Sequence, residues 1–226
     1  MGNNFLDASK ELHETNPNYG KASEYQRKGT MKNSLCIPKA VQYCQEKHGA
    51  KSFLDHGTGK GGLIHALKTH PDIKVKITGY DPAVKQFASK PDHKYDIVSS
   101  IDVLEHIGIT EINETIAEIQ SLTEGFFFFC IDLLPASKKT RDNRNAHFLI
   151  APPDWWIQKL QNNFKILTCM EVGETEDGSR YPMHLFGGAT NSMEYFSMMN
   201  DFLQKIEIAN KRWVLRSDGI VTARNY

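Results

Sequence analysis

The stretch Asp55-His56-Gly57-Thr58-Gly59-Lys60-Gly61-Gly62 decides the fold, because of what lies on either side of it. Residues 52–56 have the pattern of a short strand, and residues 61–69 that of an amphipathic helix. Glycines in a turn that leaves a strand and opens a helix let the backbone approach a ligand closely. The helix that follows offers unpaired N–H groups in its first turn. The stretch therefore predicts a ligand-binding loop, with a loop that only turns the chain as the alternative.

The alternation of strands and helices continues along the chain. We expect strands at residues 52–56, 74–80, 95–100, 126–133, 164–171 and 183–189, and helices at residues 38–48, 61–69, 82–88, 110–122, 152–162 and 192–209. Strands that alternate with helices imply a parallel sheet covered on both faces. The apolar run Phe126–Ile131 fits a strand that is buried on both faces. The predicted fold class is therefore α/β, with a doubly wound, mostly parallel sheet.

An acidic residue, Asp81, ends the second expected strand. It comes about 20 residues after the glycine loop, where a carboxylate accepts hydrogen bonds from the hydroxyls of a ribose. Asp81 therefore indicates a nucleoside ligand, without choosing among the nucleoside cofactors. A helix N-cap ahead of Pro82 is the alternative.

The third expected strand begins the segment Tyr95-Asp96-Ile97-Val98-Ser99-Ser100-Ile101-Asp102-Val103-Leu104-Glu105-His106-Ile107. This segment resembles the fourth-strand segment of class I S-adenosylmethionine-dependent methyltransferases, where it follows the glycine loop and the ribose acid in the same order. The segment Asn143-Arg144-Asn145-Ala146-His147 with Trp155-Trp156 resembles, more loosely, small stand-alone bacterial and phage members. The resemblance implies a Rossmann-like methyltransferase fold and methyl transfer from S-adenosylmethionine.

The carboxylate of Asp55 favours S-adenosylmethionine over a dinucleotide as the ligand of the glycine loop. The glycines alone fit both the GxGxxG and the GxGxG spacing. A pyrophosphate bound by the loop amides would repel a carboxylate two residues before the first glycine, whereas the ammonium and sulfonium of S-adenosylmethionine would attract it. The predicted cofactor-binding residues are Asp55, Gly57, Thr58, Gly59, Gly61, Asp81, Pro82, Ser100, Ile101 and Asp102.

The segment between Asp81 and Tyr95 is shorter than this family usually has, because a further helix and strand normally lie there. The residues that contact the adenine are therefore open, and Asp92 is one candidate.

Methyl transfer from a sulfonium is an in-line displacement, which requires a nucleophile about 3 Å from the methyl carbon. A hydroxyl or protonated amine also needs a base for its proton. His147 is the leading candidate, because histidine titrates near neutrality and this one lies in a polar loop; a role only in pinning that loop is the alternative. Asp132 and His106 complete the catalytic candidates, and no metal ligand is predicted.

The 226 residues suit one methyltransferase domain, since no repeat or linker divides them. We divide it into an N-terminal arm or lid (residues 1–35), a cofactor-binding core (36–190), and a C-terminal helix and tail (191–226). Tyr19, Lys21 and Tyr25 of the arm are candidates for closing over the site.

Composition sets limits on the partners. Acidic and basic residues balance at 27 each, which argues against a broadly basic nucleic-acid footprint. We see no secretion signal, and no apolar run is long enough to cross a bilayer. Cys36, Cys44, Cys130 and Cys169 show no metal-type pairing. We expect a cytoplasmic protein with reduced thiols and no membrane contact, and a homodimer is possible.

A small-molecule or glycan acceptor with an oxygen or nitrogen nucleophile is the function we expect. Nucleic-acid methylation is disfavoured, because residues 99–102 replace the tetrapeptide D/N/S-P-P-Y/F/W of adenine-directed enzymes, and no Pro-Cys pair supports cytosine C5 chemistry. Asp55 opposes a nicotinamide oxidoreductase. A non-catalytic module that binds S-adenosylmethionine as a scaffold stays open.

Overall fold

The computed structural model describes residues 5–17, 19, 37–172, 184–206, 212–215 and 221–224. Its helices are α1 (Phe5–Thr15), α2 (Ile37–His48), α3 (Gly62–Thr69), α4 (Ile112–Leu122), α5 (Pro153–Gln161) and α6 (Met193–Lys205). Its strands are β1 (Ser52–His56), β2 (Lys76–Tyr80), β3 (Tyr95–Ile101), β4 (Thr123–Asp132), β5 (Ile166–Val172), β6 (His184–Thr190), β7 (Arg212–Leu215) and β8 (Val221–Arg224). Two 3₁₀ turns are η2 (Lys85–Phe87) and η3 (Leu104–His106).

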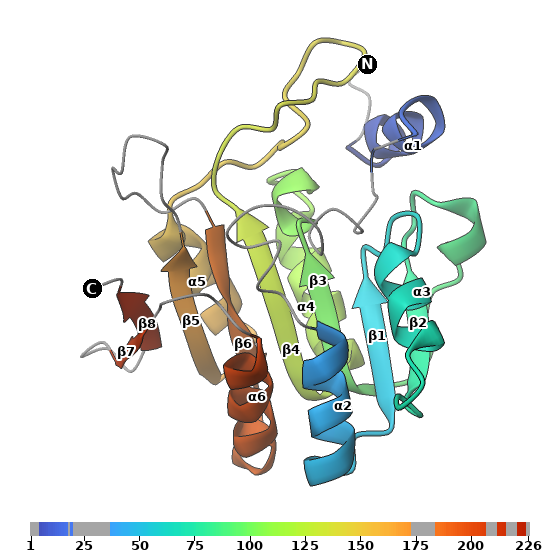
Figure 1. Cartoon of the computed structure of the whole chain (residues 1–226). Coiled ribbons are helices and arrows are strands. Elements are labelled where there is room, and N and C mark those ends of the chain that lie inside the picture. The colour runs from blue at the N-terminus through green and yellow to red at the C-terminus, as the bar shows by residue number, and fades with distance from the viewer. Residues whose placement is uncertain are drawn as a thin grey trace.

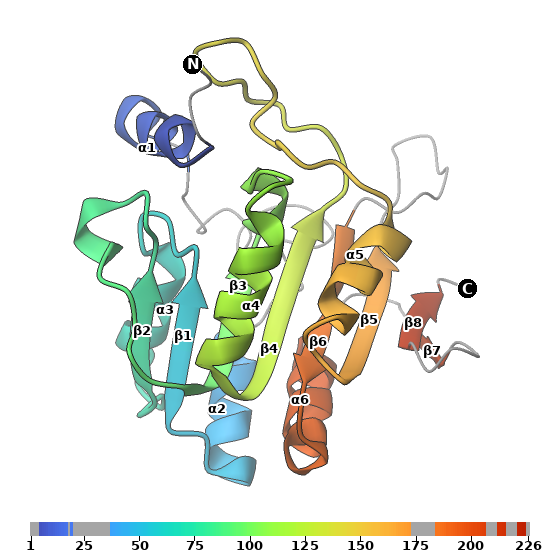
Figure 2. The same cartoon turned by 180° about the vertical axis from the view of Figure 1, so that it is seen from behind.

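Six strands form the central sheet in the order β2-β1-β3-β4-β6-β5. β2, β1, β3 and β4 run parallel, and β6 is antiparallel to both β4 and β5. α2, α3 and α6 cover one face of this sheet, and α4 and α5 cover the other (Figures 1 and 2). The prediction of a doubly wound, mostly parallel α/β sheet is confirmed.

β4 shows why the sequence requires two covered faces. Successive strand residues point to opposite faces, so Phe126 and Phe128 pack toward α2 and α6, while Phe127 and Phe129 pack toward α4 and α5. All four rings are fully buried, and burial of each contributes about 2 kcal/mol. Trp156 of α5 is fully buried as well, beneath the face that β4 shares with α5.

The expected helix at residues 82–88 is wrong, since only the short turn η2 forms there. The Asp81 N–H donates to the Phe87 carbonyl at 3.0 Å, and the Asp81 carboxylate accepts from the Ala83 N–H at 2.9 Å. These bonds close the segment into a loop before a helix can propagate. Within the continuously described residues 37–172, no strand intervenes between β2 and β3, so β2 forms an edge of the sheet.

The N-terminal arm contains a helix that the sequence analysis did not predict. Ala8 and Leu12 of α1 are buried, and α1 lies beyond the carboxyl ends of the parallel strands (Figure 1). The loop from β4 to α5 arches over the same end of the sheet. This end of the sheet is therefore roofed by two segments that are far apart in the sequence.

Three further findings concern the rest of the described chain. α6 is the helix expected in the C-terminal part of the chain, and it packs into the core beside α2. Cys44, Cys130 and Cys169 are buried and form no disulfide with one another, and burial raises the pKa of the Cys44 thiol to about 12. Cys36 lies outside the described residues. None of the described helices is long and apolar enough to span a membrane.

Candidate functional site

A cavity of about 440 Å³ is lined by residues of α1 and by residues at the carboxyl ends of the parallel strands. Ligands of doubly wound sheets bind at this edge. Among the described residues, five carboxyl side chains line the cavity against one lysine, Lys138, and no arginine. The five are Asp55, Asp81, Asp102, Glu118 and Asp132. Such a lining favours a ligand that carries positive charge.

The glycine loop forms one wall of the cavity and is held by backbone contacts. Gly57 and Gly59 have φ angles of 81° and 55°, which glycine adopts without strain. The Gly57 N–H donates to the Tyr80 carbonyl at 2.8 Å, so the loop is tied to the end of β2. A Cβ atom on Gly57 would lie 2.4 Å from the Val103 side chain. The loop therefore requires glycine here for both conformation and space.

Asp81 lies beside this loop with hydrogen-bonding capacity left over. Its Oδ2 accepts from the Gly59 N–H at 2.8 Å, and its Oδ1 from the Ala83 N–H at 2.9 Å. An ionised carboxylate offers about four acceptor positions. Among the described residues, these two N–H groups leave two acceptor positions of Asp81 unused. Its role in binding a ribose stays a prediction.

Asp55 lies at the end of β1, where it is almost fully buried. Its Oδ1 accepts a hydrogen bond of 2.8 Å from the Ser99 hydroxyl. Burial nevertheless raises the pKa of the Asp55 carboxyl, because the charged form is poorly solvated. A cationic ligand beside Asp55 would offset that penalty and would itself be bound more tightly.

Most of the predicted cofactor-binding residues line this one cavity. Gly61 and Ser100 do not. Gly61 faces the Phe87 ring and serves the turn into α3. Ser100 is fully buried, and strand alternation points it to the face opposite Ile101. Asp92, the candidate for the adenine, is exposed, pairs with its neighbour His93, and does not line the cavity.

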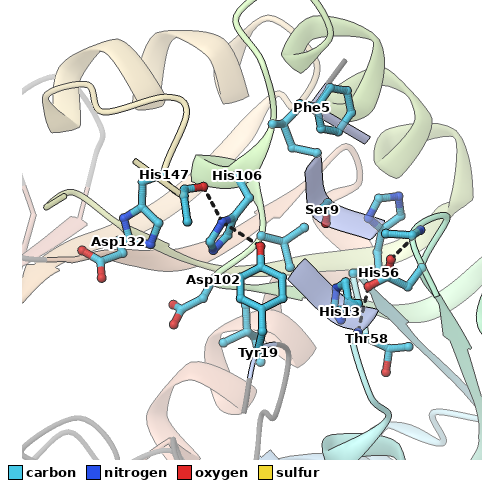
Figure 3. A pocket seen from close by; sticks show the side chains of 18 of the residues that line it. Phe5, Ser9, His13, Tyr19, His56, Thr58, Asp102, His106, Asp132 and His147 are labelled. Carbon is cyan, nitrogen blue, oxygen red and sulfur yellow. Dashed lines mark hydrogen bonds between the residues drawn. The ribbon is translucent and has the colours of Figure 1, made fainter. Parts of the chain in front are cut away.

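All three predicted catalytic residues, His106, Asp132 and His147, line the cavity (Figure 3). Nδ1 of His106 lies 2.8 Å from the Ala146 carbonyl, and Nδ1 of His147 lies 2.5 Å from the Leu134 carbonyl. A carbonyl can only accept, so each Nδ1 carries a hydrogen and Nε2 is left as the basic nitrogen. The two rings meet edge to face, 4.7 Å apart between centroids.

The arm reaches this pair of histidines through Tyr19. The Tyr19 hydroxyl oxygen lies 3.2 Å from Nδ1 of His106, where it accepts from the shared N–H. Burial and the neighbouring His147 lower the pKa of His106 to about 3, so this ring is neutral at physiological pH. The prediction that Tyr19 belongs to a lid stays a proposal, but the residue does line the cavity. Lys21 and Tyr25 lie outside the described residues.

Three carboxyl groups lie close to the histidines. Asp102 has a φ angle of 52°, and burial together with nearby Asp132 raises the pKa of its carboxyl. Glu105 is fully buried behind the cavity wall, and its Oε1 accepts from the Asp132 N–H at 3.1 Å. Burial, with nearby Asp102, also raises the pKa of Glu105. Among the described residues, no lysine or arginine forms an ion pair with these three groups.

Several residues of the cavity wall were not predicted from the sequence. His13 of α1 packs edge to face on Tyr19, with ring centroids 4.8 Å apart. Glu118 of α4 accepts a hydrogen bond of 3.2 Å from His56, and this bond is the main cause that lowers its pKa to about 2. An apolar repeat at Phe5, Ala8 and Leu12 signals α1, but no local pattern places α1 or α4 against the cavity.

The doubly wound sheet, the glycine loop with its positive φ angles, and the acid at the end of β2 are the features expected of a class I methyltransferase. A family model described as a methyltransferase domain matches residues 25–170, and the chain belongs to this family. The enzyme class predicted from the motifs, an S-adenosylmethionine-dependent methyltransferase, is confirmed.

Solved structures agree on the fold. Magnesium protoporphyrin IX methyltransferase from Synechocystis PCC 6803, with bound SAM, has a TM-score of 0.55 at 14% identity, over 85% of this chain and 99% of that one. The DhpI–SAH complex has a TM-score of 0.52 at 13% identity, over 85% of this chain and 100% of that one. No curated protein matches the chain.

Proposed function

We propose that this enzyme methylates an oxygen or nitrogen atom of a small-molecule or glycan acceptor. The observation that supports the proposal is that one cavity, covered by α1 and the loop after β4, has two sides lined by different kinds of residues. Thr58 of the glycine loop lies on one side of the cavity, and His106 and His147 lie on the other (Figure 3). Asp55 and Asp81, which flank the loop and the end of β2, line the same cavity. A cofactor and an acceptor can therefore meet within it.

The cofactor occupies the glycine side in this proposal. The ammonium of S-adenosylmethionine lies near Asp55, whose buried carboxyl lines the cavity and already accepts a hydrogen bond from Ser99. The ribose lies at Asp81, which keeps two acceptor positions free. The sulfonium then points toward the histidine side. Carboxylates along the wall stabilise both positive charges of the cofactor.

The acceptor occupies the histidine side. Its nucleophile attacks the methyl carbon in line with the departing sulfur, so that the new O–C or N–C bond forms as the S–C bond breaks and sulfur keeps the electron pair. His147 is the first candidate to take the acceptor's proton, on Nε2, because its Nδ1–H is held by the Leu134 carbonyl. His106 and Asp132 are the other candidates.

The roof over the cavity supports a small acceptor. α1 and the loop after β4 both lie across the carboxyl ends of the strands, and residues from both line the cavity. A segment of polymer would have to pass between them to reach the histidines, whereas a small molecule or a terminal sugar enters without displacing the roof.

The test is release of S-adenosylhomocysteine by the purified protein with defined acceptor panels. One panel holds small hydroxylated and amino compounds with monosaccharides and oligosaccharides, and the other holds single-stranded RNA, duplex RNA and DNA. Turnover with the first panel alone supports the proposal. Turnover with the second panel alone replaces it with nucleic-acid methylation. Tight cofactor binding without turnover on either panel favours the non-catalytic scaffold.

A further inference from the structure

Three side chains beside the cavity offer metal-ligating atoms at close quarters. Glu105 and His106 belong to η3, and His147 lies in the loop between β4 and α5. One oxygen of Glu105 and one nitrogen of each histidine all lie within 4.8 Å of one another. Two segments far apart in the sequence are thus folded so that two imidazoles and one carboxylate converge.

Glu105 is a buried carboxylate that lacks a partner for half of its acceptor atoms. Its side chain is fully buried, and its Oε1 accepts a hydrogen bond of 3.1 Å from the Asp132 N–H. Its Oε2 is buried without a hydrogen-bond partner among the described residues. Buried carboxylates are normally hydrogen-bonded, paired with a cation or bound to a metal ion. The unused oxygen is therefore a ligand atom that a bound cation would satisfy.

The histidines are oriented as metal ligands usually are. A ligating histidine almost always donates its second N–H to a carbonyl or a carboxylate, which fixes the ring and leaves the other nitrogen for the metal. The Nδ1–H of His106 donates to the Ala146 carbonyl, and the Nδ1–H of His147 donates to the Leu134 carbonyl. Nε2 of each ring is consequently the nitrogen with a free lone pair.

We propose that Glu105, His106 and His147 bind one divalent transition-metal ion, such as Mn²⁺ or Zn²⁺, whose open positions face the cavity. Two imidazoles with one carboxylate suit such ions, whereas Mg²⁺ and Ca²⁺ take oxygen ligands. Ligand atoms about 2.1 Å from one ion lie at most about 4.2 Å apart. Small side-chain rotations therefore complete the site from the present spacing.

This inference rests on the proposed function and changes the chemistry on the acceptor side. An acceptor hydroxyl that binds the ion becomes more acidic and loses its proton to the carboxylate of Asp132, which lines the same cavity. The resulting alkoxide attacks the methyl carbon, the O–C bond forms, and sulfur leaves with the S–C electron pair. Asp132 then returns the proton to water. The two histidines act as ligands in place of bases, and the acceptor class narrows to hydroxyl compounds.

Metal binding can be measured without knowing the acceptor. The full chain, without a histidine tag and stripped with a chelator, is titrated calorimetrically with MnCl₂ and separately with ZnCl₂, and Mn²⁺ uptake is followed by electron paramagnetic resonance. We expect one equivalent of metal ion at micromolar Kd. The substitutions His147→Asn and Glu105→Gln should weaken it at least tenfold. The control is His48→Gln, which changes a histidine of α2 that pairs with Asp201 of α6. This substitution should leave the affinity for the metal ion unchanged.

The same samples are titrated with S-adenosylhomocysteine, which separates this inference from the proposed function. Absence of metal uptake by a protein that binds S-adenosylhomocysteine overturns the metal site and leaves the methyltransferase proposal intact. Equal metal binding by His147→Asn and the control also overturns it. No binding of S-adenosylhomocysteine, with or without Mn²⁺, overturns the proposed function instead. Should Glu105→Gln fail to fold, as judged by its thermal melt, His147→Asn decides the question.

Discussion

The two sides of the cavity are built in different ways. The glycine side is made from the loop after β1 and the end of β2, two nearby segments that are joined by backbone N–H groups and shaped by positive φ angles. The histidine side is made from side chains of η3, the end of β4, the following loop and the arm. The glycine side is therefore a local property of the sequence, whereas the histidine side exists only in the folded chain. Each side can be broken separately.

The largest effect is expected on the histidine side, from His147→Asn. The Asn amide can still donate to the Leu134 carbonyl, so the loop keeps its hydrogen bond while Nε2 is lost. We expect kcat to fall by about 100- to 1,000-fold, whether Nε2 serves as base or as ligand. The Kd for S-adenosylhomocysteine, measured by calorimetry, should stay within about twofold. A parallel loss of cofactor affinity would show that the two sides are not separable.

The next largest effect is expected on the glycine side, from Gly57→Ala. The added Cβ would lie 2.4 Å from Val103 at a φ angle of 81°, so the loop must shift. We expect about 30- to 100-fold weaker binding of S-adenosylhomocysteine, equivalent to about 2–3 kcal/mol. Gly49→Ala is the matched control, since Gly49 has a φ angle of 70° with open space around its Cβ position. Similar losses in both variants would contradict a loop-specific role.

A smaller effect concerns the wall beside the glycine loop, where His56 and Lys90 hold Glu118 ionised. The pKa of Glu118 is lowered to about 2 from its ordinary 4.5, so its stabilisation is complete above pH 4.5 and disappears as pH falls toward 2. We expect Glu118→Gln to lower the free energy of unfolding by about 1–2 kcal/mol at pH 7. That deficit should shrink at pH 3.

Urea unfolding at the two pH values checks this prediction. Glu124→Gln is its control, because Glu124 makes only an exposed ion pair with Lys94 at 3.5 Å, and such pairs contribute little. A deficit for Glu118→Gln that is the same at both pH values would show that its ionisation does not stabilise the fold.

The smallest effect is expected from Tyr19→Phe, which removes one hydroxyl from the histidine side. The ring still packs against His13, but the contact of 3.2 Å with His106 is lost. One hydrogen bond contributes about 0.5–1 kcal/mol, so we expect KM for the acceptor to rise about two- to fivefold. Steady-state kinetics should show this with an unchanged Kd for S-adenosylhomocysteine. A change in cofactor affinity alone would place Tyr19 on the wrong side of the cavity.

Local patterns predicted the parts of the molecule that local forces determine. The alternation of strands and helices, the loop at Gly57 and Gly59, and the acid Asp81 all depend on neighbours in the sequence, and the structure brings them together. The sequence predicts a helix after Asp81. In the structure, the Asp81 N–H donates a hydrogen bond to the Phe87 carbonyl, and this bond closes the segment into a loop. Because that hydrogen bond joins two backbone groups, no pattern of side chains in the sequence predicts it.

Tertiary contacts explain what the sequence could not show. His13 reaches the cavity only because α1 lies over the strand ends, and Glu118 only because α4 covers that part of the sheet. His106 and His147 were both predicted as catalytic candidates, but their common orientation by backbone carbonyls and the unused oxygen of buried Glu105 are visible only in the fold.

The most direct test of the central claim is a calorimetric titration with S-adenosylmethionine and S-adenosylhomocysteine, with NAD as control, on the wild type and on Asp81→Ala. We expect micromolar binding of both sulfur nucleosides and none of NAD. The variant should bind them at least tenfold more weakly, because the two hydrogen bonds proposed between the ribose and the Asp81 carboxylate are lost. Binding of NAD, binding of neither sulfur nucleoside, or an Asp81→Ala variant with wild-type affinity would contradict S-adenosylmethionine binding at this site.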